Sequence, residues 1–163
     1  SEAAVTDAKS NIEWLKNNSQ LSHVTCHMFI SDVRELVKHV VSQSVDAIVT
    51  EPYLGPPLSG REDKVTLGKI RRDVQMLVTD AFEAFAQVLR LNGRVVIVFP
   101  VLGGELLPID GIEKLGWKPV SVVPEEARRL SGITTRGTIL YSRDDQHLAR
   151  EITVWTPLEV ARP

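Results

Sequence analysis

The sequence predicts one α/β domain over residues 1–163, with a mostly parallel sheet that ends in an antiparallel C-terminal hairpin. Short apolar runs alternate with helical patterns, as they do in sheets with crossover helices. Residues 94–99 form a continuous apolar run without alternation, which is typical of a strand covered on both faces. Two further strand patterns, 137–142 and 151–156, flank a polar turn and predict the terminal hairpin. A length of 163 residues suits a single domain.

The first two elements are expected to be a helix and a strand. Apolar residues recur at helical spacing over residues 2–17, and Asn17-Asn18 forms a polar stop. Residues 24–30 alternate, which predicts a strand whose one face carries Val24, Cys26, Met28 and Ile30.

A second helix, a short strand and a stiff loop are expected next. Asp32 opens a helical pattern through about residue 42, and its spacing to Glu35 fits a capping box. Residues 46–50 form a short apolar strand. Residues 51–57 contain three prolines and a glycine, so this segment predicts a rigid loop at the end of that strand.

The second half of the chain continues the alternation. Apolar residues at spacings of three and four predict one long helix over residues 62–91, closing on Asn92-Gly93. The central strand 94–99 follows. A short helix over 109–115 and a strand over 117–123 then precede the hairpin. In such a sheet, ligands are expected at the carboxyl ends of the strands.

Composition and charge exclude several classes of protein. Nineteen basic and 21 acidic residues give a net charge of -2, so a uniformly basic nucleic-acid-binding surface is excluded and any basic patch must be local. One cysteine, Cys26, excludes an internal disulfide framework or a multi-cysteine zinc site and favours the cytoplasm. No apolar run approaches the roughly 20 residues that cross a bilayer.

Several familiar site motifs are missing from the sequence. It contains no Gly-x-Gly-x-x-Gly, Walker loop, Gly-x-Ser-x-Gly or His-Glu-x-x-His pattern. His23 and His27 lie near Cys26, but on a strand they would face away from it, so we expect no metal site there.

The strongest chemical signal is Glu51-Pro52-Tyr53, at the carboxyl end of the predicted strand 46–50. It combines a carboxylate, a backbone carbonyl on a φ-restricted residue and an aromatic ring. A planar base with an amino group could use all three. An isolated tripeptide of this kind is more often a turn with an exposed acid and a packing tyrosine, so its context decides.

Several segments in order resemble the class I S-adenosylmethionine-dependent methyltransferases, which have a Rossmann-like sheet. The likeness is to the RNA methylase family related to the tRNA guanine-N2 methyltransferases, which often carry a THUMP domain. Residues 46–55, Asp-Ala-Ile-Val-Thr-Glu-Pro-Tyr-Leu-Gly, resemble the fourth motif of that family. Residues 1–15 resemble its helix after the second strand, and Ser31-Asp32 its adenine-contacting acid. Residues 136–143, with Gln146 and 150–152, resemble its terminal hairpin.

The chain departs from the family pattern in two places. Glu51 stands where the family usually has Asp or Asn, and one proline is missing before Tyr53. The family's first strand, its glycine-rich cofactor loop and its ribose-binding acid precede the helix with which this sequence starts. We therefore expect a partial catalytic domain, 1–163, whose sheet lacks the N-terminal strands.

The resemblance implies a mechanism and a cofactor. Glu51 and the Pro52 carbonyl would each accept one N–H of an exocyclic base amine while Tyr53 stacks on the base, and S-adenosylmethionine would donate the methyl group. Asp32 would accept a hydrogen bond from the cofactor adenine. A helix N-cap is the equally weighted alternative for Asp32.

Basic residues near the loop form a second candidate surface. Four of them lie in the first half of the long helix and could contact phosphate, although a solvated helix face is favoured over that role: Lys64, Lys69, Arg71 and Arg72. The same caution applies to Arg128, Arg129 and Arg136.

The function implied is methylation of guanine N2 in tRNA, with tRNA or another RNA as partner and an RNA-binding domain upstream. No membrane contact is expected, and the oligomeric state stays open. The alternatives are a DNA adenine-N6 or cytosine-N4 methyltransferase and a noncatalytic α/β nucleic-acid-binding module.

Overall fold

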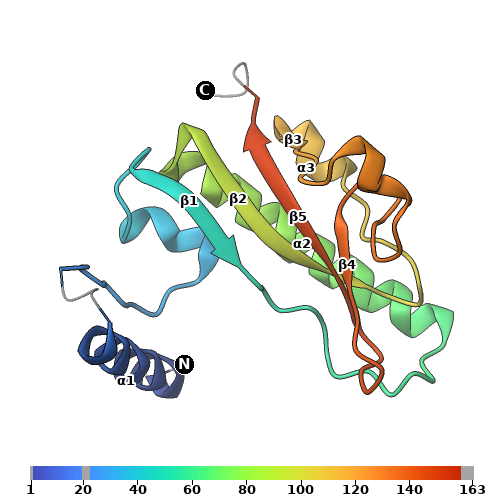
Figure 1. The fold of residues 1–163 in the computed structure, drawn as a ribbon, viewed down its shortest axis with the longest axis horizontal. Helices are drawn as coiled ribbons and strands as arrows, with labels where there is room; N and C mark the ends of the chain where they lie inside the picture. The colour runs from blue at the N-terminus through green and yellow to red at the C-terminus, as the bar shows by residue number, and fades with distance from the viewer. Residues whose placement is uncertain (1, 20–22, 159–163) are drawn as a thin grey trace.

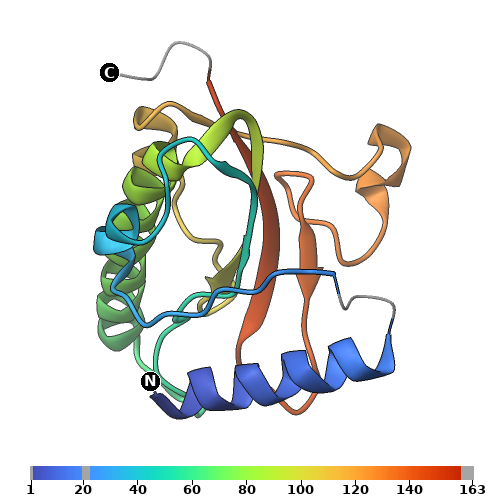
Figure 2. The same ribbon diagram turned by 90° about the vertical axis from the view of Figure 1, so that its left-hand side faces the viewer.

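The computed structural model describes residues 2–19 and 23–158 and contains one five-stranded sheet (Figure 1). Figure 2 shows α2 and η1 together on one side of this sheet. In chain order the elements are α1 (Glu2–Asn18), η1 (Val33–Lys38), β1 (Val45–Thr50), α2 (Lys64–Val88), β2 (Leu89–Val101), α3 (Asp110–Lys114), β3 (Trp117–Pro119), η2 (Glu125–Arg129), β4 (Ile139–Tyr141) and β5 (Ala149–Pro157).

The sheet has the order β1-β2-β5-β3, with β4 also pairing with β5. The pair β1–β2 is parallel, whereas β5 is antiparallel to β2, β3 and β4. Four strands therefore run in one direction and β5 alone runs against them. This arrangement confirms the predicted α/β class with its antiparallel C-terminal strand pair. It also brings the carboxyl ends of β1 and β2 to the end of the sheet where β5 begins.

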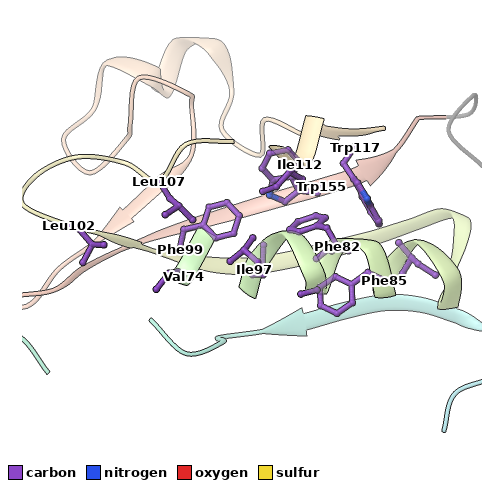
Figure 3. Close-up of a cluster of buried hydrophobic side chains, with 14 of the residues drawn as sticks. Val74, Phe82, Phe85, Ile97, Phe99, Leu102, Leu107, Ile112, Trp117 and Trp155 are labelled. Atoms are coloured by element: carbon purple, nitrogen blue, oxygen red, sulfur yellow. The ribbon is translucent and has the colours of Figure 1, made fainter. Parts of the chain in front are cut away.

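Helix α2 supplies much of the core, as its apolar spacing predicts. The Asp63 side chain caps its N-terminus by accepting a hydrogen bond from the Thr66 amide at 2.7 Å. Phe82 is fully buried, and its ring lies edge-on to Trp117 and Trp155, with centroids 5.0 and 5.4 Å away (Figure 3). Burying one such side chain contributes about 1.5–3 kcal/mol. This aromatic cluster fixes α2 against the sheet.

Strand β2 lies inside the sheet, between β1 and β5. Val95, Ile97 and Phe99 are buried on the face toward α2, but Val96 and Val98 on the other face are only half-buried. The predicted cover on both faces is therefore complete on one face and only partial on the other. Among the described residues, α2 and η1 lie on the same side of the sheet.

The predicted strand over residues 24–30 does not form. The segment is irregular, and nearly all of its residues are exposed. A strand needs a neighbour for its backbone hydrogen bonds, and in the described part of the chain β1 pairs only with β2. Alternating side chains alone therefore misled the prediction.

The helix predicted over 31–42 is only the short 3-10 helix η1. Asp32 caps it as expected, by accepting a hydrogen bond from the Arg34 amide at 3.0 Å. Glu35 does not complete a capping box, because its carboxylate pairs with Lys38 at 2.6 Å.

Other boundaries differ by a few residues. Helix α2 ends at Val88 instead of 91, because Leu89 has extended backbone angles and pairs with Val45 of β1. The predicted strand 117–123 is assigned only over Trp117–Pro119, although the Val120 amide still donates to Val154. Helices 2–17 and 109–115 are confirmed to within one residue at each end.

Candidate functional site

The loop after β1 begins with Glu51 and continues without regular structure to Asp63. Leu54 is buried and anchors it to the body of the protein. Gly55 has φ +108°, and a Cβ atom there would lie 2.8 Å from Cγ2 of Ile70 on α2. The loop therefore follows the helix so closely that only glycine fits without strain.

Glu51 lies at the carboxyl end of β1, and its side chain is half exposed. Its Oε1 accepts a hydrogen bond from Nε of Arg150 on β5 at 3.1 Å. Among the described residues, no side chain or amide donates to Oε2 of Glu51. One carboxylate oxygen is therefore held, and the other is free to accept a hydrogen bond from a ligand.

Pro52 and Tyr53 border different cavities. Pro52 is half-buried and lines a cavity of about 760 Å³ between β1, η1 and α2. Tyr53 is 60% exposed and lines a second cavity of about 500 Å³ beside the first turns of α2. Hence Pro52 and Tyr53 each border one space, and both spaces lie within the usual volume range for small-molecule sites, whereas Glu51 lines neither.

Asp32 lines the same large cavity as Pro52. Its Oδ1 accepts from the amide and from Nε of Arg34 at 3.0 and 2.9 Å, and its Oδ2 accepts from Nη2 at 2.7 Å. The hydrogen bonds from Arg34 hold the pKa of Asp32 well below its usual range. A carboxylate has about four acceptor positions, so Oδ2 retains one for a ligand amino group.

The second cavity has mixed walls. Tyr53, Pro56 and Val65 give it apolar surface, and Lys69 and Asp73 add opposite charges. Val65 is 79% exposed although it is apolar. An aromatic ring, an aliphatic wall and an ammonium group together suit a planar base that carries a phosphate.

Glu62 closes the end of the loop. Its Oε1 accepts hydrogen bonds from the amide and hydroxyl of Ser59 at 2.6 and 2.8 Å, and its Oε2 accepts from the Gly60 amide at 3.1 Å. These bonds, led by the one from the Ser59 amide, lower the pKa of Glu62 to about 2. The loop is thus fixed at both ends, by Leu54 and by Glu62.

The structure divides the basic residues into two groups. Arg71 is turned inward, where it pairs with Glu105 at 2.7 Å and donates to the Leu102 carbonyl at 3.1 Å. Arg136 donates to the Leu107 carbonyl at 2.8 Å and lies 3.3 Å from the fully buried carboxylate of Glu151. Neither guanidinium points freely to solvent, which argues against a phosphate-contacting role for these two residues.

The other candidate basic residues are exposed: Lys64, Lys69, Arg72, Arg128 and Arg129. Only Lys69 among them lines one of the two cavities beside the loop. The basic surface near the site is therefore smaller than the sequence suggests.

Arg150 is a site residue that the sequence pattern did not predict. It stands 99 positions from Glu51 in the chain and was noted only within the terminal hairpin. One signal was available. Arg150 lies at the start of β5, and because β5 runs antiparallel to the other strands, its start lies at their carboxyl ends.

Residues 2–19 and 23–158 contain neither a candidate metal site nor a candidate membrane span. No group of three or more His, Cys, Asp or Glu in these ranges could hold a metal ion. No helix within them has the length and apolarity to cross a membrane. Cys26 is exposed and unpaired.

Comparisons with known proteins give distant structural likenesses. No family model matches the sequence, and no curated protein matches it. Crystal structures of a candidate DNA modification methylase from Thermus thermophilus are similar in structure. One holds S-adenosyl-L-methionine and has 16% identity and a TM-score of 0.46, over 82% of this chain and 56% of that one. Another, without that ligand named, has 18% identity and the same TM-score, over 82% and 55%. The chain spans about half the length of these structures.

Proposed function

We propose that this chain transfers a methyl group from S-adenosylmethionine to an exocyclic amine of a nucleobase in RNA, with guanine N2 of tRNA as the acceptor. One observation carries the proposal: Pro52 and Tyr53, which directly follow Glu51, line one cavity each, and Asp32 lines the same cavity as Pro52. Methyl transfer requires two ligands to meet at one point. Adjacent loop residues border both cavities, which supports a meeting point at this loop.

The larger cavity suits the cofactor. Its volume of about 760 Å³ lies in the range of small-molecule sites. Asp32 offers its Oδ2 to the adenine amino group, and apolar residues of β1 and α2 line the rest. When bound there, S-adenosylmethionine would supply an electrophilic methyl carbon, whose bond to sulfur breaks as the amine nitrogen attacks and whose bonding electrons return to sulfur.

The loop residues make the amine reactive. An exocyclic amine is a weak nucleophile because its lone pair is delocalised into the ring. Glu51 Oε2 and the Pro52 carbonyl accept its two N–H groups, which localises the lone pair and directs it toward the methyl carbon. Both acceptors also stabilise the positive charge that develops on nitrogen. After transfer, nitrogen carries one surplus proton, which Glu51 can accept and pass to water.

Tyr53 and the second cavity suit the base. The exposed ring provides a stacking surface, a contact worth about 1–3 kcal/mol per base in single-stranded nucleic acid. Lys69 lies at the same cavity and can pair with a phosphate. RNA as the substrate and guanine N2 as the acceptor rest on the family resemblance of residues 46–55 and of the terminal hairpin.

A DNA amino-methyltransferase is the second candidate. A loop with an acid, a proline carbonyl and a tyrosine ring serves adenine N6 or cytosine N4 by the same chemistry, because each of these bases carries an exocyclic amine. A noncatalytic binding module is the alternative outside enzymes. We place the protein in the cytoplasm, since an exposed free thiol suits a reducing compartment.

The nucleoside product tests the proposal. The chain is incubated with methyl-labelled S-adenosylmethionine and either unmodified tRNA or duplex DNA, and the nucleic acid is digested to nucleosides. We expect label in N2-methylguanosine from tRNA. Label in N6-methyl-2′-deoxyadenosine or N4-methyl-2′-deoxycytidine from DNA would favour the second candidate, and binding of tRNA without transfer would favour the noncatalytic module.

A further inference from the structure

Arg150 at the start of β5 reaches Glu51 at the end of β1. Its Nε lies 3.1 Å from Oε1 of Glu51, and its Nη1 lies 2.7 Å from Oε1 of Gln146. The Arg150 side chain is 23% exposed, against 50% for Glu51. We propose that Arg150 is a positioning residue that orients the Glu51 carboxylate toward the acceptor amine. This inference rests on the proposed function.

The geometry leaves one oxygen of Glu51 for the substrate. A guanidinium carries its donors in a rigid planar fork. Here one side of the fork holds Glu51 Oε1, and the other is held by Gln146. Both ends of the Arg150 group are therefore fixed. Because Arg150 holds Oε1 of Glu51, the position of Oε2 at the start of the loop is also restricted.

The frame behind this contact is rigid. Within the sheet, Arg150 is opposite Pro100 of β2 and Tyr141 of β4. Strand β2 also pairs with β1, which leads directly into Glu51. The contact therefore ties the first residue of an irregular loop to a strand that has neighbours on both sides.

A second contact joins the same two segments. Gly60 of the loop lies against the His147 ring, so closely that a Cβ atom on Gly60 would be 2.6 Å from Nδ1. His147 belongs to the connection between β4 and β5 (Figure 1). The terminal hairpin thus contacts the loop at its beginning, through Arg150, and again near its end.

The alternative is that Arg150 merely neutralises Glu51. In that role the Arg150 cation would make the Glu51 carboxylate a weaker hydrogen-bond acceptor. It would also repel the positive charge that forms on the amine. Removing Arg150 would in that case raise the rate. If Arg150 positions the carboxylate, removing it lowers the rate, since displacement of a reacting group by about 1 Å can cost about 100-fold. The two roles predict opposite signs.

The test compares Arg150→Met with Arg150→Lys and with Arg143→Met. Arg143 is a matched control, because it lies in the same hairpin but donates to the Tyr141 hydroxyl at 2.7 Å and not to Glu51. We expect Arg150→Met to lower kcat about 10- to 100-fold with KM for S-adenosylmethionine unchanged. Arg150→Lys should restore part of kcat, and Arg143→Met should leave it unchanged.

A double variant shows whether Arg150 acts through Glu51. In a Glu51→Gln background, Arg150→Met should cause little further loss, because the carboxylate that it orients is gone. An equal loss in both backgrounds, or a faster Arg150→Met enzyme, overturns the inference.

A spectroscopic readout separates this inference from the proposed function. The Nε–H resonance of Arg150, assigned by its loss in Arg150→Lys, should be protected from exchange and should shift in Glu51→Ala. An unprotected, unshifted resonance refutes the contact whatever the activity. A protected resonance in a chain that transfers no methyl group refutes the proposed function, and with it any positioning role in methyl transfer.

Discussion

Gly55→Ala tests the close approach between α2 and the loop that follows β1. Gly55 has φ +108°, and its added Cβ would lie 2.8 Å from Cγ2 of the buried Ile70. An alanine at this positive φ lowers the unfolding free energy by about 1–2 kcal/mol. Alanine also restricts the unfolded chain more than glycine does, which raises the unfolding free energy by about 0.4–1 kcal/mol. Crowding Ile70 adds about 1–3 kcal/mol, as overpacking of a core does. The net expected loss of unfolding free energy is therefore about 1–5 kcal/mol.

Gly104→Ala is the matched control. Gly104 has φ +80°, but no atom lies within 4 Å of a Cβ added there. Gly104→Ala should lose only the free energy that the positive φ costs. Gly55→Ala should therefore be less stable than Gly104→Ala by about 1–3 kcal/mol, the cost of crowding Ile70. Urea unfolding measures both, and methyl transfer should fall only in Gly55→Ala, since only that loop carries Pro52 and Tyr53. Equal unfolding free energies with equal activity would refute the close packing of the loop on α2.

Three further predictions concern the core, the loop end and the cofactor. In urea unfolding, Phe82→Ala should lower the unfolding free energy by about 3–5 kcal/mol. Val65→Ala, at an exposed position of the same helix, should change it by less than about 0.5 kcal/mol. Similar losses in the two variants would contradict the burial of Phe82 in the aromatic cluster. The lowered pKa of Glu62 means that its stabilisation is complete above about pH 4.5 and is lost as the pH falls through about 2. The stability difference between wild type and Glu62→Gln should therefore shrink over that window, and a constant difference would contradict the assignment. Asp32→Asn should weaken S-adenosylmethionine binding in calorimetry more than Glu35→Gln does, and equal affinities would limit Asp32 to capping η1.

The parts of the fold that depend on local pattern could be predicted from the sequence. The 3.6-residue repeat over α2 and the apolar run of β2 are long, and the physics of each is contained within its own segment. The alternation over residues 24–30 was equally regular, but strand formation depends on a neighbour that the sequence cannot show. Helix α2 ended early for the same kind of reason, because Leu89 pairs with a distant strand.

In the candidate site too, local features could be predicted from the sequence and contacts between distant residues could not. The local pattern alone predicts residues 51–53 at a strand end, and in the structure Pro52 and Tyr53 each line one of two cavities. The contact of Arg150 with Glu51 spans 99 positions and depends on the order and direction of the strands. Arg71 and Arg136 looked like surface charges, because their partners, Glu105 and Glu151, are recognised only in three dimensions.

The most direct test of the account is methyl transfer to unmodified tRNA by wild type and by Glu51→Gln, with equal folding checked by circular dichroism. The substitution keeps the shape of the side chain but replaces a charged acceptor oxygen. The account predicts that kcat falls by about 10² to 10³, the usual cost of removing one preorganised hydrogen-bonding group, while binding of S-adenosylmethionine is unchanged. Equal turnover by the two proteins would remove Glu51 from the chemistry and contradict the account.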